Sequence, residues 1–129
     1  MSVEFAYTAK TAKSFDEAVA SIEKETEQKG FKTLHIHDFG TVLKEKGFPR
    51  EPIKVLEICS AKHANLLLQA EVKISLLLPC RIVVYVENGE VNICAFRPIL
   101  FPKLYPETNI QSLVEEIDQV ICSIVDRAK

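Results

Sequence analysis

The chain has 129 residues, of which 47% are apolar, and its formal net charge is −2. This length suits one domain with a buried hydrophobic core, so we expect residues 1–129 to form a single domain. Sixteen basic and eighteen acidic residues give no long-range attraction for phosphate backbones or anionic lipids. The composition therefore argues against nucleic-acid and membrane partners.

The start of the chain and its cysteines indicate a cytoplasmic protein. No apolar run reaches the roughly 18 residues of a membrane span, and no basic and then apolar leader opens the chain. Thiols stay reduced in the cytoplasm, and no two cysteines have the C-x-x-C spacing of a redox or zinc motif. We therefore expect four free thiols, at Cys59, Cys80, Cys94 and Cys122.

Periodicity and turn residues predict six elements in the first half: strands at 3–8, 31–38 and 53–59, and helices at 14–29, 41–46 and 61–70. Ser14, followed by Asp16 and Glu17, places a cap and acidic side chains where the dipole of the first helix favours them. Asp38 is expected to cap the short second helix. His63, near the start of the third helix, is expected to face solvent or cap a turn.

The second half begins with an apolar segment, 72–78, whose pattern leaves helix, strand and loop open. Asn88-Gly89 is a strong hairpin signal, so we predict strands at 81–87 and 90–96 on either side of it. After three prolines, Thr108 is expected to cap a long final helix with one broad apolar face.

This order of elements predicts an α+β fold. A parallel sheet would need a helix at each crossover, and the hairpin breaks that alternation. We therefore expect a curved, mainly antiparallel sheet of about five strands, with the two long helices packed on one face.

With both long helices on one side, each strand turns its more apolar row toward them. In the second strand that row is Leu34 and Ile36, which leaves Thr33, His35 and His37 on the opposite, open face. The same rule places a mixed set of other residues on this face: Glu57, Cys59, Arg81, Tyr85 and Cys94, with Val55, Val83 and Phe96 among them. Such a composition is typical of a surface that binds a partner or a ligand.

Several short segments, taken in order, form a pattern that covers most of the chain: Ser14-Phe15-Asp16-Glu17-Ala18, Gly30-Phe31, His37-Asp38, Lys46-Gly47, Val55-Leu56-Glu57-Ile58-Cys59 leading into Ala61-Lys62-His63-Ala64, Leu78-Pro79-Cys80-Arg81-Ile82, and Asn88-Gly89. In this pattern the chain resembles an uncharacterised family, domain of unknown function number 302. The resemblance implies a fold similar to the TATA-binding-protein class and a small, often dimeric protein. It implies no activity and no DNA binding, because function depends on sites and not on folds.

His35 and His37, two residues apart on one strand face, are a candidate metal pair. Cys59, Glu57 or Cys94 from other strands would complete a tetrahedral set for a transition metal such as zinc. The alternative is a pair of surface or interface histidines, because the H-x-H pattern is common. We favour an interface rich in His and Tyr.

Arg81 is the candidate for binding an anionic ligand. Its guanidinium, near His37 and Tyr85, would hold a carboxylate or a phosphate. The alternative, which we favour, is an ion pair with Glu57 across the strands. The neighbouring Cys80 would be a nucleophile if Arg81 lowered its pKa, but adjacent strand residues point to opposite faces, so we expect Cys80 in the core.

Two hypotheses of function follow. In the first, a non-enzymatic homodimeric domain binds its partner subunit, a small-molecule ligand or both through the open face, with binding residues His37, Arg81, Tyr85 and Glu57. In the second, a metal- or thiol-dependent enzyme uses His35, His37, Cys59 and Arg81. Nucleic-acid binding is a weaker third hypothesis, because the charge is wrong and no strand combines aromatic with basic residues.

Overall fold

A five-stranded antiparallel sheet forms the centre of the computed structural model, which describes residues 4–129. The strands lie in the order β1-β5-β4-β3-β2, and every neighbouring pair is antiparallel. Their bounds are Ala6–Thr11 for β1, Lys32–Asp38 for β2, Ile53–Cys59 for β3, Cys80–Glu87 for β4 and Glu90–Phe96 for β5. The predicted α+β fold is confirmed.

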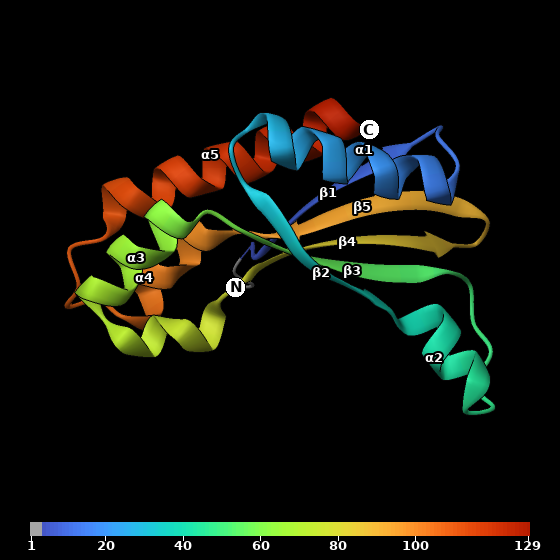
Figure 1. Ribbon diagram of the computed structural model, residues 1–129, viewed down its shortest axis with the longest axis horizontal. Coiled ribbons are helices and arrows are strands. Elements are labelled where there is room, and N and C mark those ends of the chain that lie inside the picture. The colour runs from blue at the N-terminus through green and yellow to red at the C-terminus, as the bar shows by residue number, and fades with distance from the viewer. Residues whose placement is uncertain (1–3) are drawn as a thin grey trace.

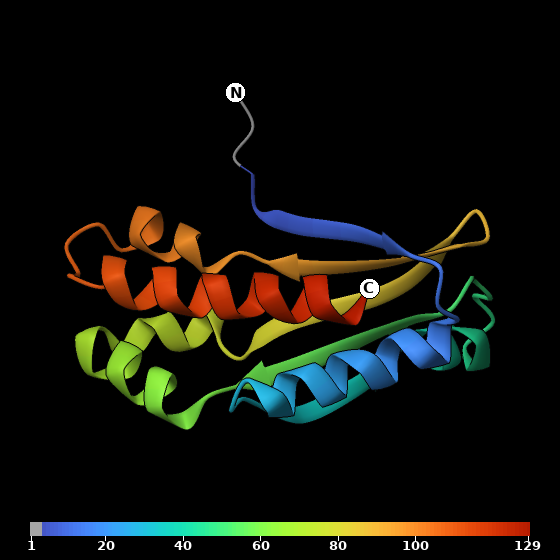
Figure 2. The same cartoon turned by 90° about the horizontal axis from the view of Figure 1, so that it is seen from above.

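The helices occupy one face and the two ends of this sheet. They are α1 (Phe15–Gln28), α2 (Phe39–Glu45), α3 (Ala61–Ala70), α4 (Phe101–Leu104) and α5 (Gln111–Ala128), with short 3-10 helices η1 (Val72–Leu77) and η2 (Pro98–Leu100). The long helices α1 and α5 lie on the same side of the sheet (Figures 1 and 2). Figure 1 shows α2 at one end of the sheet and α3, η1 and α4 at the other. The opposite face of the sheet is therefore left open between these two ends.

The core lies between the sheet and the two long helices. The three central strands supply it with side chains that are at most 1% exposed, namely Leu56, Ile58, Ile82, Val84, Ile93 and Ala95. From the other side α1 and α5 supply a second set, which includes Ala18, Val19, Ile22, Val114, Ile117 and Ile121. In β3, β4 and β5 these buried residues belong to the apolar rows that the sequence predicts to point toward the helices.

Local signals in the sequence explain where several elements begin and turn. The hydroxyl of Ser14 accepts the amide of Glu17, whose carboxylate accepts the amide of Ser14, so a capping box starts α1. Between β4 and β5, Asn88 and Gly89 both have positive φ, 53° and 78°, as a two-residue type I′ hairpin requires. Asp38 caps α2, as predicted, by accepting the amide of Thr41.

Two predicted elements begin at other residues in the structure, and a third segment, which the sequence left open, forms a helix. The first strand is β1, Ala6–Thr11, rather than 3–8, because its pairing with β5 runs from Ala6 to Thr11; residue 3 of the prediction lies outside the described part. The ambiguous segment 72–78 contains the 3-10 helix η1. The final helix begins at Gln111, and the hydroxyl of Thr108 does not cap it but donates to the carbonyl of Tyr105 at 2.6 Å.

A bulge in β2 changes the predicted faces of two residues. Thr33 and His35 stand opposite consecutive residues of β3, so Leu34 is an extra residue in the strand. Leu34 is 53% exposed rather than inward, and the hydroxyl of Thr33 is buried rather than on the open face. The predictions for Leu34 and Thr33 are therefore wrong. Ile36 packs against the core as expected, and His35 and His37 lie on the open face.

Among residues 4–129 no helix is both long enough and apolar enough to cross a lipid bilayer.

Candidate functional site: the open face of the sheet

The open face consists of three rows of side chains on the side of the sheet away from α1 and α5. Strand register aligns these rows as His35-Glu57-Arg81, then His37-Val55-Val83-Cys94-Thr8, then Ile53-Tyr85-Asn92-Lys10. Although no helix lies over its middle, the side chains shield one another, and Val55 and Asn92 are only 9% and 7% exposed. The open face is therefore polar, crowded and preformed.

Three of its residues form an ionic cluster, which we define as His37, Glu57 and Arg81. One carboxylate oxygen of Glu57 lies 2.9 Å from Nε2 of His37, and the other lies 3.6 Å from Nη2 of Arg81. The carboxylate is mostly buried, whereas Arg81 is half exposed. The predicted ion pair between Arg81 and Glu57 is thus present, and Nη1 of Arg81 donates to the carbonyl of Pro79 at 3.5 Å.

An aromatic group extends the ionic cluster toward α2. The rings of His35 and His37 meet edge to face with centroids 4.4 Å apart, and Phe39 stacks on His37 at 5.7 Å with the ring planes 10° apart. Phe39 is the first residue of α2 and is largely exposed. An imidazole held between a ring and a carboxylate has a fixed orientation, which suits recognition of a partner.

A second apolar feature borders the ionic cluster on the side of η1. Arg81 and Phe96 line a hollow of about 110 Å³ together with Leu76 and Pro79. Leu76 is 78% exposed, the highest value among the large apolar side chains in residues 4–129. Exposed apolar side chains therefore flank the ionic cluster on both sides.

Two of the predicted site residues lie apart from the ionic cluster. Tyr85 stands four residues from Arg81 along β4, about 13 Å away, so the two cannot hold one small anion together. Cys59 ends β3, where it lines a narrow space with Phe31 and His63 instead of joining the histidines. In residues 4–129 no group of three or more His, Cys, Asp or Glu side chains is arranged to hold a metal ion. Zinc binding at His35, His37 and Cys59 stays a prediction, without a third ligand in place.

Neither Cys59 nor Cys80 lies in surroundings that favour a nucleophilic thiolate. Burial, with a smaller contribution from Cys59, raises the pKa of Cys80 to about 12, and the nearby Arg81 offsets this only in part. Burial also raises the pKa of Cys59. Cys80 is part of the core, as expected. A thiolate at either position is therefore disfavoured near neutral pH.

His63, which the sequence interpretation placed toward solvent or in a cap, is instead half-buried. Its Nδ1 lies 2.7 Å from the hydroxyl of Ser60, and its ring packs on Phe31 with centroids 5.5 Å apart. Nε2 approaches a carboxylate oxygen of Glu116 to 3.3 Å without hydrogen-bond geometry, so we regard it as a charge contact only. Ser60 also caps α3, and this group therefore joins α3 to α5.

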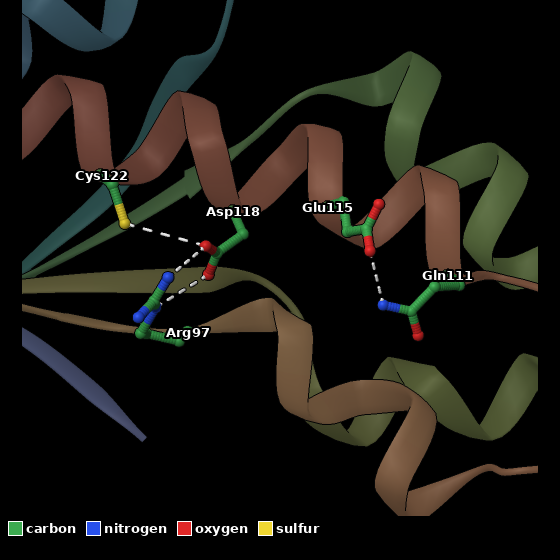
Figure 3. A network of polar contacts seen from close by, with 5 residues as sticks. All are labelled: Arg97, Gln111, Glu115, Asp118 and Cys122. Carbon is green, nitrogen blue, oxygen red and sulfur yellow. Dashed lines mark hydrogen bonds and ion pairs between the residues drawn. The ribbon is translucent and has the colours of Figure 1, made fainter. Parts of the chain in front are cut away.

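A buried polar network between β5 and α5 was not predicted (Figure 3). Arg97, just after β5, donates to both oxygens of Asp118 at 3.3 and 2.8 Å, and the thiol of Cys122 lies 3.8 Å from the same carboxylate. Asp118 is 4% exposed. One feature of the sequence could have revealed this network: Asp118 is a carboxylate on the apolar stripe of the final helix, between Val114 and Ile121. The network holds α5 on the sheet and lies on the side opposite to the open face.

Comparisons with known proteins identify relatives by sequence and by fold. Residues 7–128 match the profile of the family described as "Domain of unknown function DUF302". A solved structure, titled as an uncharacterized conserved DUF302 protein from Bacillus stearothermophilus, has 26% sequence identity to this chain and a TM-score of 0.92. The match covers 98% of this chain and 100% of that one. No curated protein matches. The implied likeness to the TATA-binding-protein class stays a prediction.

Proposed function

The chain belongs to the DUF302 family, and we propose that it is a homodimeric binding domain whose open face takes up the same face of a second copy. The observation that supports this proposal is the ionic cluster of His37, Glu57 and Arg81, flanked on both sides by exposed apolar side chains. This proposal is the first, non-enzymatic hypothesis from the sequence, with a second copy of the chain as the one partner.

The charges on the open face favour a like partner. A twofold interface uses one patch twice, so that patch must be complementary to itself. The ionic cluster contains an acidic group between two basic ones, and Leu76 and Phe39 stand on either side of it. A polyanion would meet repulsion from Glu57, and a polycation would meet repulsion from Arg81.

The size of the open face also suits a dimer. Five strands about 4.8 Å apart, each rising about 3.3 Å per residue over seven residues, give a flat area of roughly 550 Å². Side-chain relief and the flanks at α2 and η1 enlarge this area. A standard interface buries about 800 Å² per partner, which this face with its flanks approaches.

Light scattering on variants of exposed residues tests the proposal. We expect the wild-type chain to have twice its monomer mass of 14.5 kDa. Leu76→Lys and Arg81→Glu should yield monomers, since both side chains are exposed. Because Arg81→Glu sets a second carboxylate opposite Glu57, urea denaturation of this variant must show that it is still folded. Leu104→Lys, on α4 and 59% exposed, is the matched control and should remain dimeric.

Two results would overturn the proposal. One is a wild-type chain that stays monomeric at the highest soluble concentration. The other is a dimer that survives both Leu76→Lys and Arg81→Glu, because its interface would then lie elsewhere, for example at the free edge of β1 or β2.

A further inference from the structure

A separate cavity lies on the helix side of the sheet, where the start of α1 and the helix α2 meet the start of β3. Its volume is about 340 Å³, and it is lined by Phe15, Lys44, Arg50 and Lys54, among others. This volume is at the lower end of the range for small-molecule sites. Lys54 occupies an inward position of β3, so the cavity is distinct from the open face and the proposed dimer interface.

Positive charge is in excess around this cavity. Lys44, Arg50 and Lys54 all line it, and within residues 4–129 none of the three forms an ion pair with a carboxylate. Two carboxylates, those of Asp16 and Asp38, are also on the wall, and that of Asp38 accepts the amide and the hydroxyl of Thr41 at 3.0 and 2.9 Å. Three cationic groups against two carboxylates leave a net positive charge around the hollow, which favours an anion.

The orientation of the cationic groups is partly fixed by their neighbours. The ammonium of Lys54 lies 5.8 Å from the ring centroid of Phe15, which holds it at the cavity wall. Nε of Arg50 donates to the carbonyl of Glu51 at 3.1 Å, so the two terminal nitrogens of the guanidinium remain for a ligand. Phosphate and carboxylate groups match the planar fork of such a guanidinium.

Gly40 keeps the cavity narrow at the side of α2. A Cβ built on it would lie 3.3 Å from the backbone nitrogen of Ile53 and 3.5 Å from Cα of Pro52. The helix therefore approaches the start of β3 more closely than a side chain would readily permit. The helix that carries Lys44 and the start of the strand that carries Lys54 therefore lie close together at this cavity.

We propose that this cavity binds a small phosphate monoester. The three cationic groups hold the dianionic phosphate, and the ring of Phe15 and the ring of Pro52 provide an apolar wall for the organic part. A phosphate offers several acceptor oxygens to three donors at once, whereas one carboxylate offers two.

An NMR titration of the isotope-labelled chain tests this assignment with phenyl phosphate, inorganic phosphate and phenol as probes. Phenyl phosphate is expected to shift the amide signals of Gly40 and Thr41 saturably, and to bind more tightly than inorganic phosphate. Phenol should not bind. Arg50→Gln and Lys44→Gln, both at exposed positions, should each weaken phenyl phosphate binding about tenfold, because each removes a charge-assisted hydrogen bond.

The matched control is Lys46→Gln, which removes the same charge from the exposed C-terminal end of α2 without touching the cavity. It should leave the affinity unchanged. An equal loss with Lys46→Gln would overturn the proposal, because the binding would then reflect overall charge. Equal affinity for inorganic phosphate would overturn the assignment of an ester, and unsaturable shifts would overturn the site itself.

Discussion

Nε2 of His37 lies 2.9 Å from a carboxylate oxygen of Glu57 on the neighbouring strand, and this contact defines the chemistry of the open face. This contact engages one of the two imidazole nitrogens of His37 and fixes the orientation of the ring. The other oxygen of Glu57 faces Arg81 at 3.6 Å, so a single carboxylate holds both neighbours in place. The three side chains form a preformed polar centre rather than a set of free ligands.

Metal content is the first prediction. Because Cys59 lies apart from both histidines and no group of three metal-binding side chains is assembled in residues 4–129, we expect protein purified without a histidine tag to contain far less than one zinc per chain. Elemental analysis after dialysis against zinc checks this. About one zinc per chain that disappears in His37→Ala would instead support the metal-dependent enzyme.

The buried pair of Arg97 and Asp118 predicts a specific loss of stability. Asp118→Asn should lower the free energy of unfolding by about 2 kcal/mol, because it leaves the half-buried guanidinium without its charged partner. Urea denaturation measures the change. Glu115→Gln on the same helix is the control; its contact with Gln111 is exposed, so we expect a change of at most about 0.5 kcal/mol. Equal losses in both variants would contradict this account of the network.

The raised pKa of Cys80 predicts that the folded protein becomes less stable at alkaline pH. Its pKa is raised to about 12 by burial, whereas an unfolded thiol titrates near about 8.5. Above that pH the unfolded chain releases a proton that the folded chain keeps, so the stability contributed by the neutral thiol falls as the pH rises, by at most about 1.4 kcal/mol per pH unit. Urea denaturation at pH 8 and pH 10 should show a smaller decrease for Cys80→Ala than for the wild type. An identical decrease in both proteins would show that Cys80 does not titrate in this way.

The lowered pKa of Asp38 predicts that the folded protein becomes less stable at acidic pH. The amide of Thr41, and next its hydroxyl, hold the pKa of the Asp38 carboxyl below its ordinary value. A lowered pKa in the folded state gives a stabilisation that is present above the unfolded pKa and is lost as the pH falls through the folded one. Asp38→Ala should therefore cost about 1 kcal/mol at pH 7, as the loss of a helix cap does, and less at pH 3. Thermal unfolding at both pH values measures this difference, and a cost that does not change with pH would argue against it.

Much of the fold follows from local signals. Ile53–Cys59, Ala61–Ala70 and Glu90–Phe96 have the predicted bounds, because alternation, helical periodicity and the Asn88-Gly89 turn all act over a few residues. The single domain and the cytoplasmic location stay predictions.

The differences arise where contacts distant in sequence decide the structure. Nothing near Leu34 shows that β2 contains an extra residue; only its pairing with β3 does. The sequence around the small residues Ala6 and Ala9 does not show where β1 begins and ends. Its pairing with β5 sets these bounds.

The candidate site was predicted in part for the same reason. Register alone brings Glu57 beside Arg81 and two residues from Val55, the residue opposite His37, so a correct assignment of strands and faces found the ionic cluster. Cys59 is separated from the histidines because it stands two residues beyond Glu57, the residue opposite His35, at the end of β3. The cavity at Lys44, Arg50 and Lys54 combines residues from a helix, a loop and a strand, and no motif in the sequence connects them.

The most direct test of the central claim is an isotope-filtered NOE measurement on a dimer mixed from labelled and unlabelled chains. We expect intermolecular NOEs from the methyl groups of Leu76 and Val83, since both lie on or beside the open face that the second copy covers. Intermolecular NOEs confined to the outer surfaces of α1 and α5 would contradict the account, because the open face would then remain free in the dimer.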